Sequence, residues 1–280
     1  MLGKFLQYTS RGVRRNAAAH TVRASHYLGE NRTLATTIYG KKIYLSTRDL
    51  SLTPHILVDG YWEKWISDQL FHLVKPGMKV VEIGANVGYY TLLLADLVGD
   101  KGHVTAFEAN PQLANTLFHT LHLNGYHDRS TVCNLAVFDK KARLKFHVFD
   151  RFQGSSSLFA QVETAKDVRD KLRSITVQAN TLDAAFDGEA DYLKIDAEGA
   201  EPFILRGAER VLQNKNILVQ LEFAPAMLNS YPGGASAMLD ILQMHGFKTK
   251  IFSSDKGLQS ISREALLATA HCDILLSRHH

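Results

Sequence analysis

The chain has 280 residues, 45% of them hydrophobic and 21% charged, which suits one large domain with a full core and excludes a mainly disordered protein. Its net charge of +4 is spread along the chain and forms no basic stripe beyond the N-terminus, so we expect no nucleic-acid partner. No apolar run is long enough to span a bilayer, and no secretory signal follows Met1. Cys133 and Cys272 lie in apolar, strand-like segments and predict buried free thiols, which is typical of a cytoplasmic protein.

The N-terminus is unusual because its first 29 residues hold five basic side chains and no acid. One interpretation is a basic amphipathic segment that rests on an anionic membrane, or a transit peptide. The other is a poorly ordered arm, or a helix docked on a sister subunit. We favour an arm over residues 1–35 and leave peripheral membrane contact and a homo-oligomer open. The basic residues are Lys4, Arg11, Arg14, Arg15 and Arg23.

Residues 36–78 are predicted to form a small cap before the main domain. The segment Thr36–Leu45 predicts two short strands around Gly40-Lys41. Apolar spacing from Trp62 to Val74 predicts a helix, which Lys75-Pro76-Gly77 ends.

From residue 79 to residue 280, strand and helix patterns alternate. This order is typical of an α/β domain in which helices cover both faces of a doubly wound, mostly parallel sheet. We expect seven strands, with a ligand beyond their carboxyl ends. Two alternating segments, 143–149 and 174–179, predict a small antiparallel insertion. Strands are predicted at 79–83, 103–107, 130–137, 192–195, 217–223, 247–252 and 273–276, and helices at 90–98, 111–124, 201–212 and 235–245.

The segment VVEIGANVGYYT, residues 80–91, delivers a buried strand to a glycine turn and a helix N-terminus. Gly84 and Gly88 let the backbone approach a ligand closely. A dinucleotide site would have Gly-x-Gly-x-x-Gly here, but this turn reads Glu-x-Gly-x-Asn-x-Gly. An acid at the position of Glu82 would repel a phosphate. It could instead meet the amino group of a methionine moiety, directly or through water.

A second acid, Glu108 in FEANP, ends the next predicted strand. Nucleoside-binding sheets grasp a ribose diol with a carboxylate at this place. The alternative is that Glu108 only caps the helix that begins at Pro111, although Asn110 could do that. Two acids on successive strand ends around a glycine turn indicate an adenosyl ligand without phosphates.

The segment DYLKIDAEGAE, residues 191–201, carries the third signal. In an extended chain Lys194, Asp196 and Glu198 point to one side. Three charges at a strand end are costly unless they meet one another, a metal or a substrate. The alternative is a capped loop before a helix that starts at Glu201, where acids are stabilising. We expect a catalytic role for Asp196, assisted by Glu198 and Lys194.

These motifs resemble the FkbM family of S-adenosylmethionine (SAM)-dependent methyltransferases. The resemblance runs from about Tyr61 to Leu221 and also covers NLAV, GSSSL and the TLD at 181–183. The family usually carries Asp where Glu82 stands, and Glu keeps the charge with a longer reach. The resemblance implies a class I methyltransferase fold, which is Rossmann-like, with SAM as cofactor and a sugar or natural-product hydroxyl as acceptor.

The resemblance also implies roles for individual residues. Glu108 would hold the ribose, and Glu63 would close over the cofactor. Ser155 and Ser156 would border the pocket of a small-molecule or glycan acceptor. The methionine end of SAM would be lined by Glu82, Gly84, Asn86, Gly88, Tyr89 and Thr91, and the adenine would lie near Asn110, Asn134 and Ala136.

A hydroxyl is a poor nucleophile, so a general base or a metal is expected beside it. Asp196 is the first choice for base or metal ligand. Glu198 and Glu222, which ends the fifth strand, could complete an oxygen-rich Mg²⁺ site. The alternative for Glu222 is an ion pair with a nearby cation.

Other functions remain open on the same fold. The chain could methylate an amine or RNA, although no Asn-Pro-Pro-Tyr type motif follows the fourth strand. It could also bind SAM without catalysis, although the intact acids argue against this. The glycine turn disfavours an NAD-linked dehydrogenase.

Overall fold

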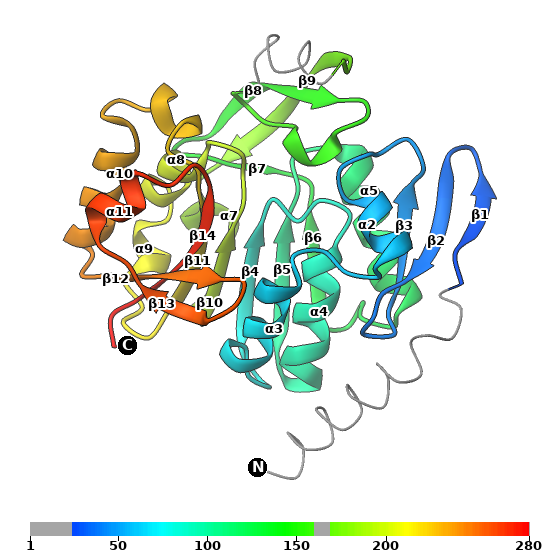
Figure 1. The fold of residues 1–280 in the computed structure, drawn as a ribbon, viewed down its shortest axis with the longest axis horizontal. Coiled ribbons are helices and arrows are strands. Elements are labelled where there is room, and N and C mark those ends of the chain that lie inside the picture. The colour runs from blue at the N-terminus through cyan, green and yellow to red at the C-terminus, as the bar shows by residue number, and fades with distance from the viewer. Residues whose placement is uncertain (1–23, 160–168, 280) are drawn as a thin grey trace.

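The computed structural model of the protein describes residues 24–159 and 169–279 and contains three sheets (Figure 1). The basic residues of the predicted N-terminal arm, and with them the predicted membrane contact, lie outside the described residues. Within the described residues no helix combines the length and the apolar character that a membrane crossing requires. Cys133 and Cys272 are free, as predicted, but half-buried where full burial was expected.

The central sheet is doubly wound and mostly parallel, as predicted. Five parallel strands form its core, β14 runs antiparallel to β11, and β12 runs antiparallel to β14. In spatial order the strands are β6 (Ser130–Cys133), β5 (His103–Phe107), β4 (Lys79–Ile83), β10 (Tyr192–Ile195), β11 (Leu218–Phe223), β14 (Cys272–Ser277), β12 (Lys248–Ser253) and β13 (Gly257–Ser260).

The expected number of seven strands is wrong, because the sheet has eight. The additional strand is β13, which pairs with β12 in an antiparallel hairpin at the edge of the sheet. Its sequence, GLQS, has no apolar alternation, and its side chains are half-buried or exposed. A strand with so little apolar surface to bury leaves no periodic signal in the sequence.

Successive residues of the central strands face two different cores, because side chains alternate across a strand. Val80 packs into the core that contains α3, α4 and α5, whereas Val81 packs into the core that contains α8, α9 and α10. The helices therefore cover both faces of the sheet (Figure 1). Their bounds are α3 (Lys64–Leu73), α4 (Tyr89–Val98), α5 (Pro111–Leu123), α8 (Glu201–Arg206), α9 (Glu209–Leu212) and α10 (Gly234–Met244).

The predicted helix over 201–212 is wrong as a single element, because it divides into α8 and α9 around Gly207. A Cβ at Gly207 would lie 2.2 Å from the carbonyl oxygen of Phe138. The chain therefore bends where it touches the backbone of a neighbouring segment. The remaining short elements are α7 (Leu182–Ala185), α11 (Arg263–Leu267) and the 3-10 turns η1 (Gly99–Lys101), η2 (Gln153–Ser155) and η3 (Met227–Ser230).

The small sheet contains β7 (Ala136–Val137), β9 (Leu172–Asn180) and β8 (Ala142–Phe149). The predicted antiparallel insertion is confirmed, since β8 pairs with β9 over its whole length. The predicted strand over 130–137 is wrong as one strand, because β6 joins the central sheet and β7 joins the small one. The break is at Asn134, whose Nδ2 donates to the carbonyl oxygens of Glu108, at 2.8 Å, and Ala109.

The N-terminal sheet contains β1 (His26–Gly29), β2 (Arg32–Thr36) and β3 (Lys42–Ser46), followed by α2 (Thr53–Val58). The predicted pair of strands is present as β2 and β3, but β2 ends at Thr36, where the first strand was expected to begin. β1 and most of β2 fall inside the range expected for the arm. A turn at Glu30-Asn31, both with positive φ, folds β1 back on β2.

Candidate functional site

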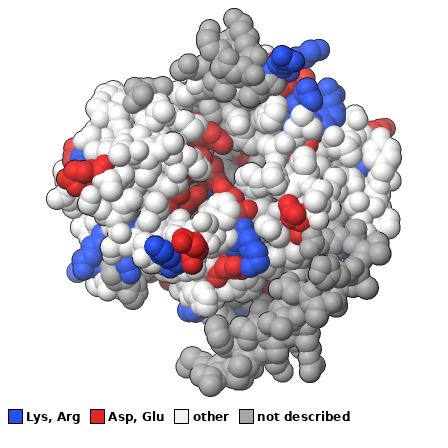
Figure 2. All heavy atoms as spheres, in the orientation of Figure 1, with Lys and Arg blue, Asp and Glu red and all other residues white. Residues whose placement is uncertain are grey.

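A cavity of about 320 Å³ opens at the carboxyl ends of the parallel strands. Seven carboxylates line it, and no lysine or arginine does so among the described residues. Figure 2 shows acidic side chains gathered at the hollow in the middle of this face. The seven are Glu63, Glu82, Glu108, Asp196, Glu198, Glu222 and Asp273.

The glycine turn after β4 forms part of the cavity wall. Gly84 has a φ of 82°, and a Cβ there would lie 1.8 Å from the carbonyl oxygen of Asp196. Gly88 has a φ of 93°, and its Cβ would lie 2.3 Å from Cδ1 of Leu117 on α5. Both positions favour glycine because of their positive φ, and the close approaches that the structure shows are to Asp196 and Leu117. Gly88 does not line the cavity.

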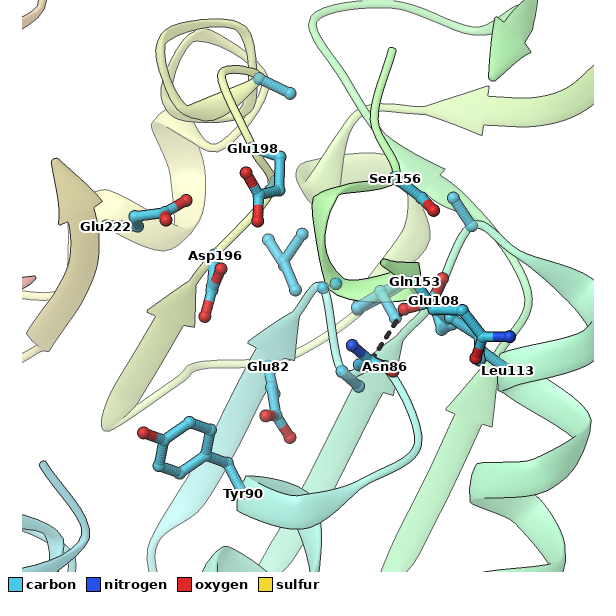
Figure 3. A pocket seen from close by; sticks show the side chains of 18 of the residues that line it. Glu82, Asn86, Tyr90, Glu108, Leu113, Gln153, Ser156, Asp196, Glu198 and Glu222 are labelled. Carbon is cyan, nitrogen blue, oxygen red and sulfur yellow. Dashed lines mark hydrogen bonds between the residues drawn. The ribbon is translucent and has the colours of Figure 1, made fainter. Parts of the chain in front are cut away.

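Glu108 follows β5 and is held by backbone amides on both sides. Its Oε2 accepts a hydrogen bond from Asn86 N at 2.8 Å (Figure 3), and its Oε1 accepts one from Asn110 N at 2.7 Å. Burial raises the pKa of Glu108 to about 7, and the amide hydrogen bonds counteract this. Each oxygen keeps a further lone pair. The carboxylate can therefore still accept hydrogen bonds from a diol.

Beneath the cavity, a buried row of polar side chains crosses the sheet. Glu82 on β4, Lys194 on β10 and Gln220 on β11 are register partners. Glu82 Oε2 accepts from Thr91 Oγ1 at 2.6 Å, and burial raises the pKa of Glu82 to about 7. Thr91 therefore supports Glu82 from below and does not itself line the cavity.

Lys194 is only 1% exposed and does not reach the cavity. Its Nζ donates to Asp196 Oδ2 at 2.8 Å and lies 4.6 Å from the ring centre of Tyr90. Burial alone would lower the pKa of Lys194, but Asp196, Glu82 and neighbouring Asp273 raise it overall. Lys194 therefore stays charged and fixes Asp196. In this structure Lys194 positions Asp196, and its predicted catalytic role stays a prediction.

Three carboxylates converge at the ends of β10 and β11. One oxygen each of Asp196, Glu198 and Glu222 lies within 4.8 Å of the other two, and Figure 3 shows the three side chains around one space. Burial, then the charge of Glu222, raises the pKa of Glu198 well above its usual value. Glu222 Oε2 is buried and has no hydrogen-bond partner among the described residues. Burial, then the charge of Asp196, also raises the pKa of Glu222.

Three titratable side chains that line the cavity were not predicted from the sequence: Tyr90, His271 and Asp273. Because β14 runs antiparallel, its first residues lie at the edge where the parallel strands end. His271 Nε2 is 2.9 Å from Glu222 Oε1, and this hydrogen bond raises the pKa of His271 to about 9. The predicted ion pair of Glu222 with a cation is therefore present. The strand predicted over residues 273–276 was the sequence signal that could have pointed to these residues.

Asp273 and Tyr90 extend the buried polar groups. Asp273 Oδ1 accepts from Gln220 Nε2 at 2.9 Å, and burial raises the pKa of Asp273 to about 7. Tyr90 donates its hydroxyl to Glu63 Oε2 at 2.8 Å. Glu63 precedes α3 with a φ of 38°, a strained conformation for a residue with a side chain. It thereby turns its carboxylate toward the cavity.

The cavity brings together most of the predicted site residues. Those that line it are Glu63, Glu82, Gly84, Asn86, Tyr89, Glu108, Ala136, Ser156, Asp196, Glu198 and Glu222. Two of the others have structural contacts: Asn110 caps α5, and Asn134 holds the backbone after β5. Those that do not line it are Lys194, Gly88, Thr91, Asn110, Asn134 and Ser155.

The sequence model described as the methyltransferase FkbM domain matches residues 82–249, which include the glycine turn, Glu108 and the three converging carboxylates. The chain belongs to the FkbM methyltransferase family. The predicted resemblance is thereby confirmed, and so is the class I methyltransferase fold. The fold and the family are those of SAM-dependent methyltransferases.

Among curated proteins, the FkbM chain is similar to protein-L-isoaspartate O-methyltransferases. One from Hyperthermus butylicus is 41% identical over 66 residues, which is 21% of this chain and 27% of the relative. One from Methanococcus aeolicus is 38% identical over 60 residues, which is 21% of this chain and 28% of the relative. The chain thus spans about a quarter of the length of the curated relatives it matches.

Among solved structures, the FkbM methyltransferase from Methylobacillus flagellatus KT is 15% identical with a TM-score of 0.46. The similarity covers 75% of this chain and 50% of that one. Fibrillarin from Aeropyrum pernix, in complex with natively bound SAM, is 11% identical with a TM-score of 0.43. That similarity covers 91% of this chain and 98% of fibrillarin.

Proposed function

We propose that this FkbM-family protein transfers a methyl group from SAM to a hydroxyl of a sugar or another small polyhydroxylated acceptor. The observation that carries the proposal is the convergence of Asp196, Glu198 and Glu222 beside the glycine turn and Glu108. The glycine turn after β4 and the carboxylate of Glu108 would bind SAM. The three carboxylates supply the proton acceptors that a neutral hydroxyl needs.

The charge of the cavity supports SAM as the cofactor. Seven carboxylates without a lysine or arginine favour a ligand that carries a sulfonium and an ammonium group. Glu108 keeps lone pairs for the ribose hydroxyls, and the acid at Glu82 lies below the methionine side of the turn. The pyrophosphate of NAD would be repelled by the same carboxylates, which disfavours a dehydrogenase.

The chain's own residues can then hold the acceptor and take its proton. Bound SAM supplies a methyl group on a positively charged sulfur. Lys194 holds one oxygen of Asp196 at 2.8 Å and so fixes its carboxylate toward the acceptor side. The methyl–sulfur bond would break and leave S-adenosylhomocysteine, while the hydroxyl oxygen bonds to the methyl carbon and its proton passes to Asp196 or Glu198. The raised pKa of Glu198 makes its carboxylate a better proton acceptor than an ordinary glutamate.

The same three carboxylates also fit a divalent cation. Mg²⁺ prefers carboxylate and water oxygens. Glu222 Oε2 is buried without a partner, which is costly unless a cation or a donor meets it. We propose Asp196, Glu198 and Glu222 as the ligands. Mg²⁺ held there would lower the pKa of the acceptor hydroxyl. Activity that survives treatment with EDTA, with no gain on adding Mg²⁺, would contradict this part of the proposal.

A carboxylate acceptor is the second candidate, because the curated relatives are isoaspartate O-methyltransferases. Seven carboxylates in the cavity oppose it, since an anionic acceptor would be repelled. The test is a methyl-transfer assay with labelled SAM and four acceptor panels: sugars, amines, isoaspartyl peptides and RNA. Mass spectrometry then locates the methyl group. We expect turnover on a hydroxyl, and turnover confined to peptides, amines or RNA would overturn the proposal.

Binding of S-adenosylhomocysteine, measured by calorimetry, separates cofactor binding from catalysis. We expect binding with one site per chain. Binding without turnover on any panel would favour a non-catalytic SAM-binding protein. Absence of binding would contradict the proposal altogether.

A further inference from the structure

A second cavity, of about 760 Å³, lies beside the first. We propose that it binds a phosphorylated sugar, with the phosphate on its arginines. Its volume lies in the range of about 300–1,000 Å³ that is usual for small-molecule sites. Leu113 and Gln153 line both cavities and form the wall between them.

The second cavity has an apolar floor and a polar rim. Four fully or almost fully buried side chains form the floor: Leu45, Val87, Leu113 and Phe149. The rim comes from elements far apart in the sequence, namely the N-terminal sheet, α5 and the β8–β9 pair. Small-molecule sites usually combine a mostly apolar lining with a small number of polar groups, and this cavity has that construction.

Three arginines line this cavity, each from a different part of the chain. Arg32 on β2 lies 3.6 Å from Glu30, and both are exposed. Arg173 on β9 lies 3.5 Å from Asp150. Nη2 of Arg173 donates a hydrogen bond to Gln112 Oε1 on α5 at 2.9 Å, and this bond fixes the guanidinium group.

Arg48, which follows β3, is different from the other two. Among the described residues, its guanidinium has no hydrogen-bond or ion-pair partner. The two carboxylates of the cavity, Glu30 and Asp150, already face Arg32 and Arg173. The cavity therefore has one positive charge in excess, on a side chain that is free to bind a ligand.

These groups favour an oxyanion that also carries hydroxyls. Guanidinium groups bind phosphate oxygens through two parallel hydrogen bonds. Amide, hydroxyl and imidazole groups on the rim can bind sugar hydroxyls; they belong to Asn31, Asn115, Thr116 and His119. A neutral sugar would leave Arg48 unpaired. The first cavity would repel a phosphate, so the two cavities do not compete for it.

The test measures binding of glucose 6-phosphate and of glucose by calorimetry, on the full chain. We expect glucose 6-phosphate to bind the wild type and glucose to bind at least tenfold more weakly. Arg48→Ala and Arg173→Ala should each weaken glucose 6-phosphate binding about tenfold, whereas Asp150→Asn should strengthen it severalfold. Arg143→Ala is the matched control, because Arg143 is an exposed arginine near the far end of β8 and outside the cavity.

Each other outcome overturns the proposal. Equal binding of glucose and glucose 6-phosphate would show that the arginines do not select the ligand. Unchanged binding in Arg48→Ala and Arg173→Ala would place the phosphate elsewhere. Binding to phosphatidylglycerol vesicles without binding to glucose 6-phosphate would show that the phosphate belongs to a lipid surface. Affinity for S-adenosylhomocysteine should stay unchanged in all variants, so failure of cofactor binding is recognised separately.

Discussion

The two cavities share a wall but carry opposite charge. Among the described residues, the charged side chains that line the first cavity are seven carboxylates and His271, whereas three arginines outnumber two carboxylates in the second. The first is built by sheet topology, because parallel strands bring their terminal acids to one edge. The second is built by peripheral elements that pack on α5. One fold can therefore offer sites for a cationic and an anionic ligand side by side, because different segments of the chain supply the acidic and the basic side chains.

The largest effect should come from Asp196. Asp196→Asn keeps an oxygen for Lys194 but loses the base, so methyl transfer should fall by roughly 10²–10⁴-fold. Affinity for S-adenosylhomocysteine should change by no more than several fold. Initial rates and calorimetry measure the two effects. Asp187→Asn, at an exposed position, is the control. Unchanged turnover would remove Asp196 from the mechanism.

Glu108 should come next, and its effect should fall on the cofactor. Glu108→Ala removes a charge-assisted contact to the ribose, so affinity for S-adenosylhomocysteine should weaken by about 1–3 kcal/mol. The same change leaves the amides of Asn86 and Asn110 without acceptors, so the melting temperature should also fall. Glu108→Gln keeps an acceptor for one amide and separates the two effects. Full affinity in both variants would contradict ribose binding.

The acidic cavity should also make stability depend on pH. Glu82, Glu108 and Asp273 each have a pKa of about 7, raised by burial from 4.5, 4.5 and 3.8. Between pH 5 and pH 7 the folded state then binds more protons than the unfolded state. The free energy of unfolding should therefore fall as pH rises, by up to about 1.4 kcal/mol per pH unit for each group.

Denaturant unfolding of the unliganded protein at several pH values measures this slope, which should flatten above pH 7. In Glu108→Gln one of the groups is lost and the slope should become shallower. Stability that rises between pH 5 and pH 7 would show that the carboxylates are stabilised in their charged form. The first cavity would then be more negatively charged near pH 7 than we infer, and its difference in charge from the second cavity would be larger.

The smallest expected effect compares two neighbouring serines. Ser156 lines the cofactor cavity and accepts a hydrogen bond from Phe149 N at 3.2 Å, whereas Ser155 does not line it. Ser156→Ala should raise KM for the acceptor a few fold, and Ser155→Ala should leave it unchanged. Steady-state kinetics measure both. Equal effects would mean that this loop does not contact the acceptor.

The sequence could predict the part of the site that depends on strand order. Glu82, Glu108 and Asp196 each stand at or near the end of a predicted strand, and parallel pairing was enough to bring them together. The family resemblance supplied the cofactor. The glycine turn was predicted to bring the backbone close to a ligand; Gly84 lines the cavity, and Gly84 and Gly88 also pack against Asp196 and Leu117.

The sequence could not predict what depends on register and long-range packing. His271 and Asp273 reach the cavity only because β14 pairs antiparallel with β11, where Glu222 meets Asp273. Lys194 bonds to Asp196 as expected, but packing within the sheet buries its whole side chain, so it does not line the cavity with Asp196 and Glu198. The second cavity needs Arg48 and Arg173 from segments more than a hundred residues apart, and no local pattern links them.

The contact between Gly84 and the carbonyl of Asp196 has a mechanical consequence. The turn that would face SAM and the loop that would face the acceptor touch through main chain, with no room for even a methyl group between them. Neither can shift without moving the other, so the distance from donor to acceptor is set by the scaffold. A different acceptor would therefore have to be accommodated by other side chains around the cavity, while the main chain of the two loops keeps its contact.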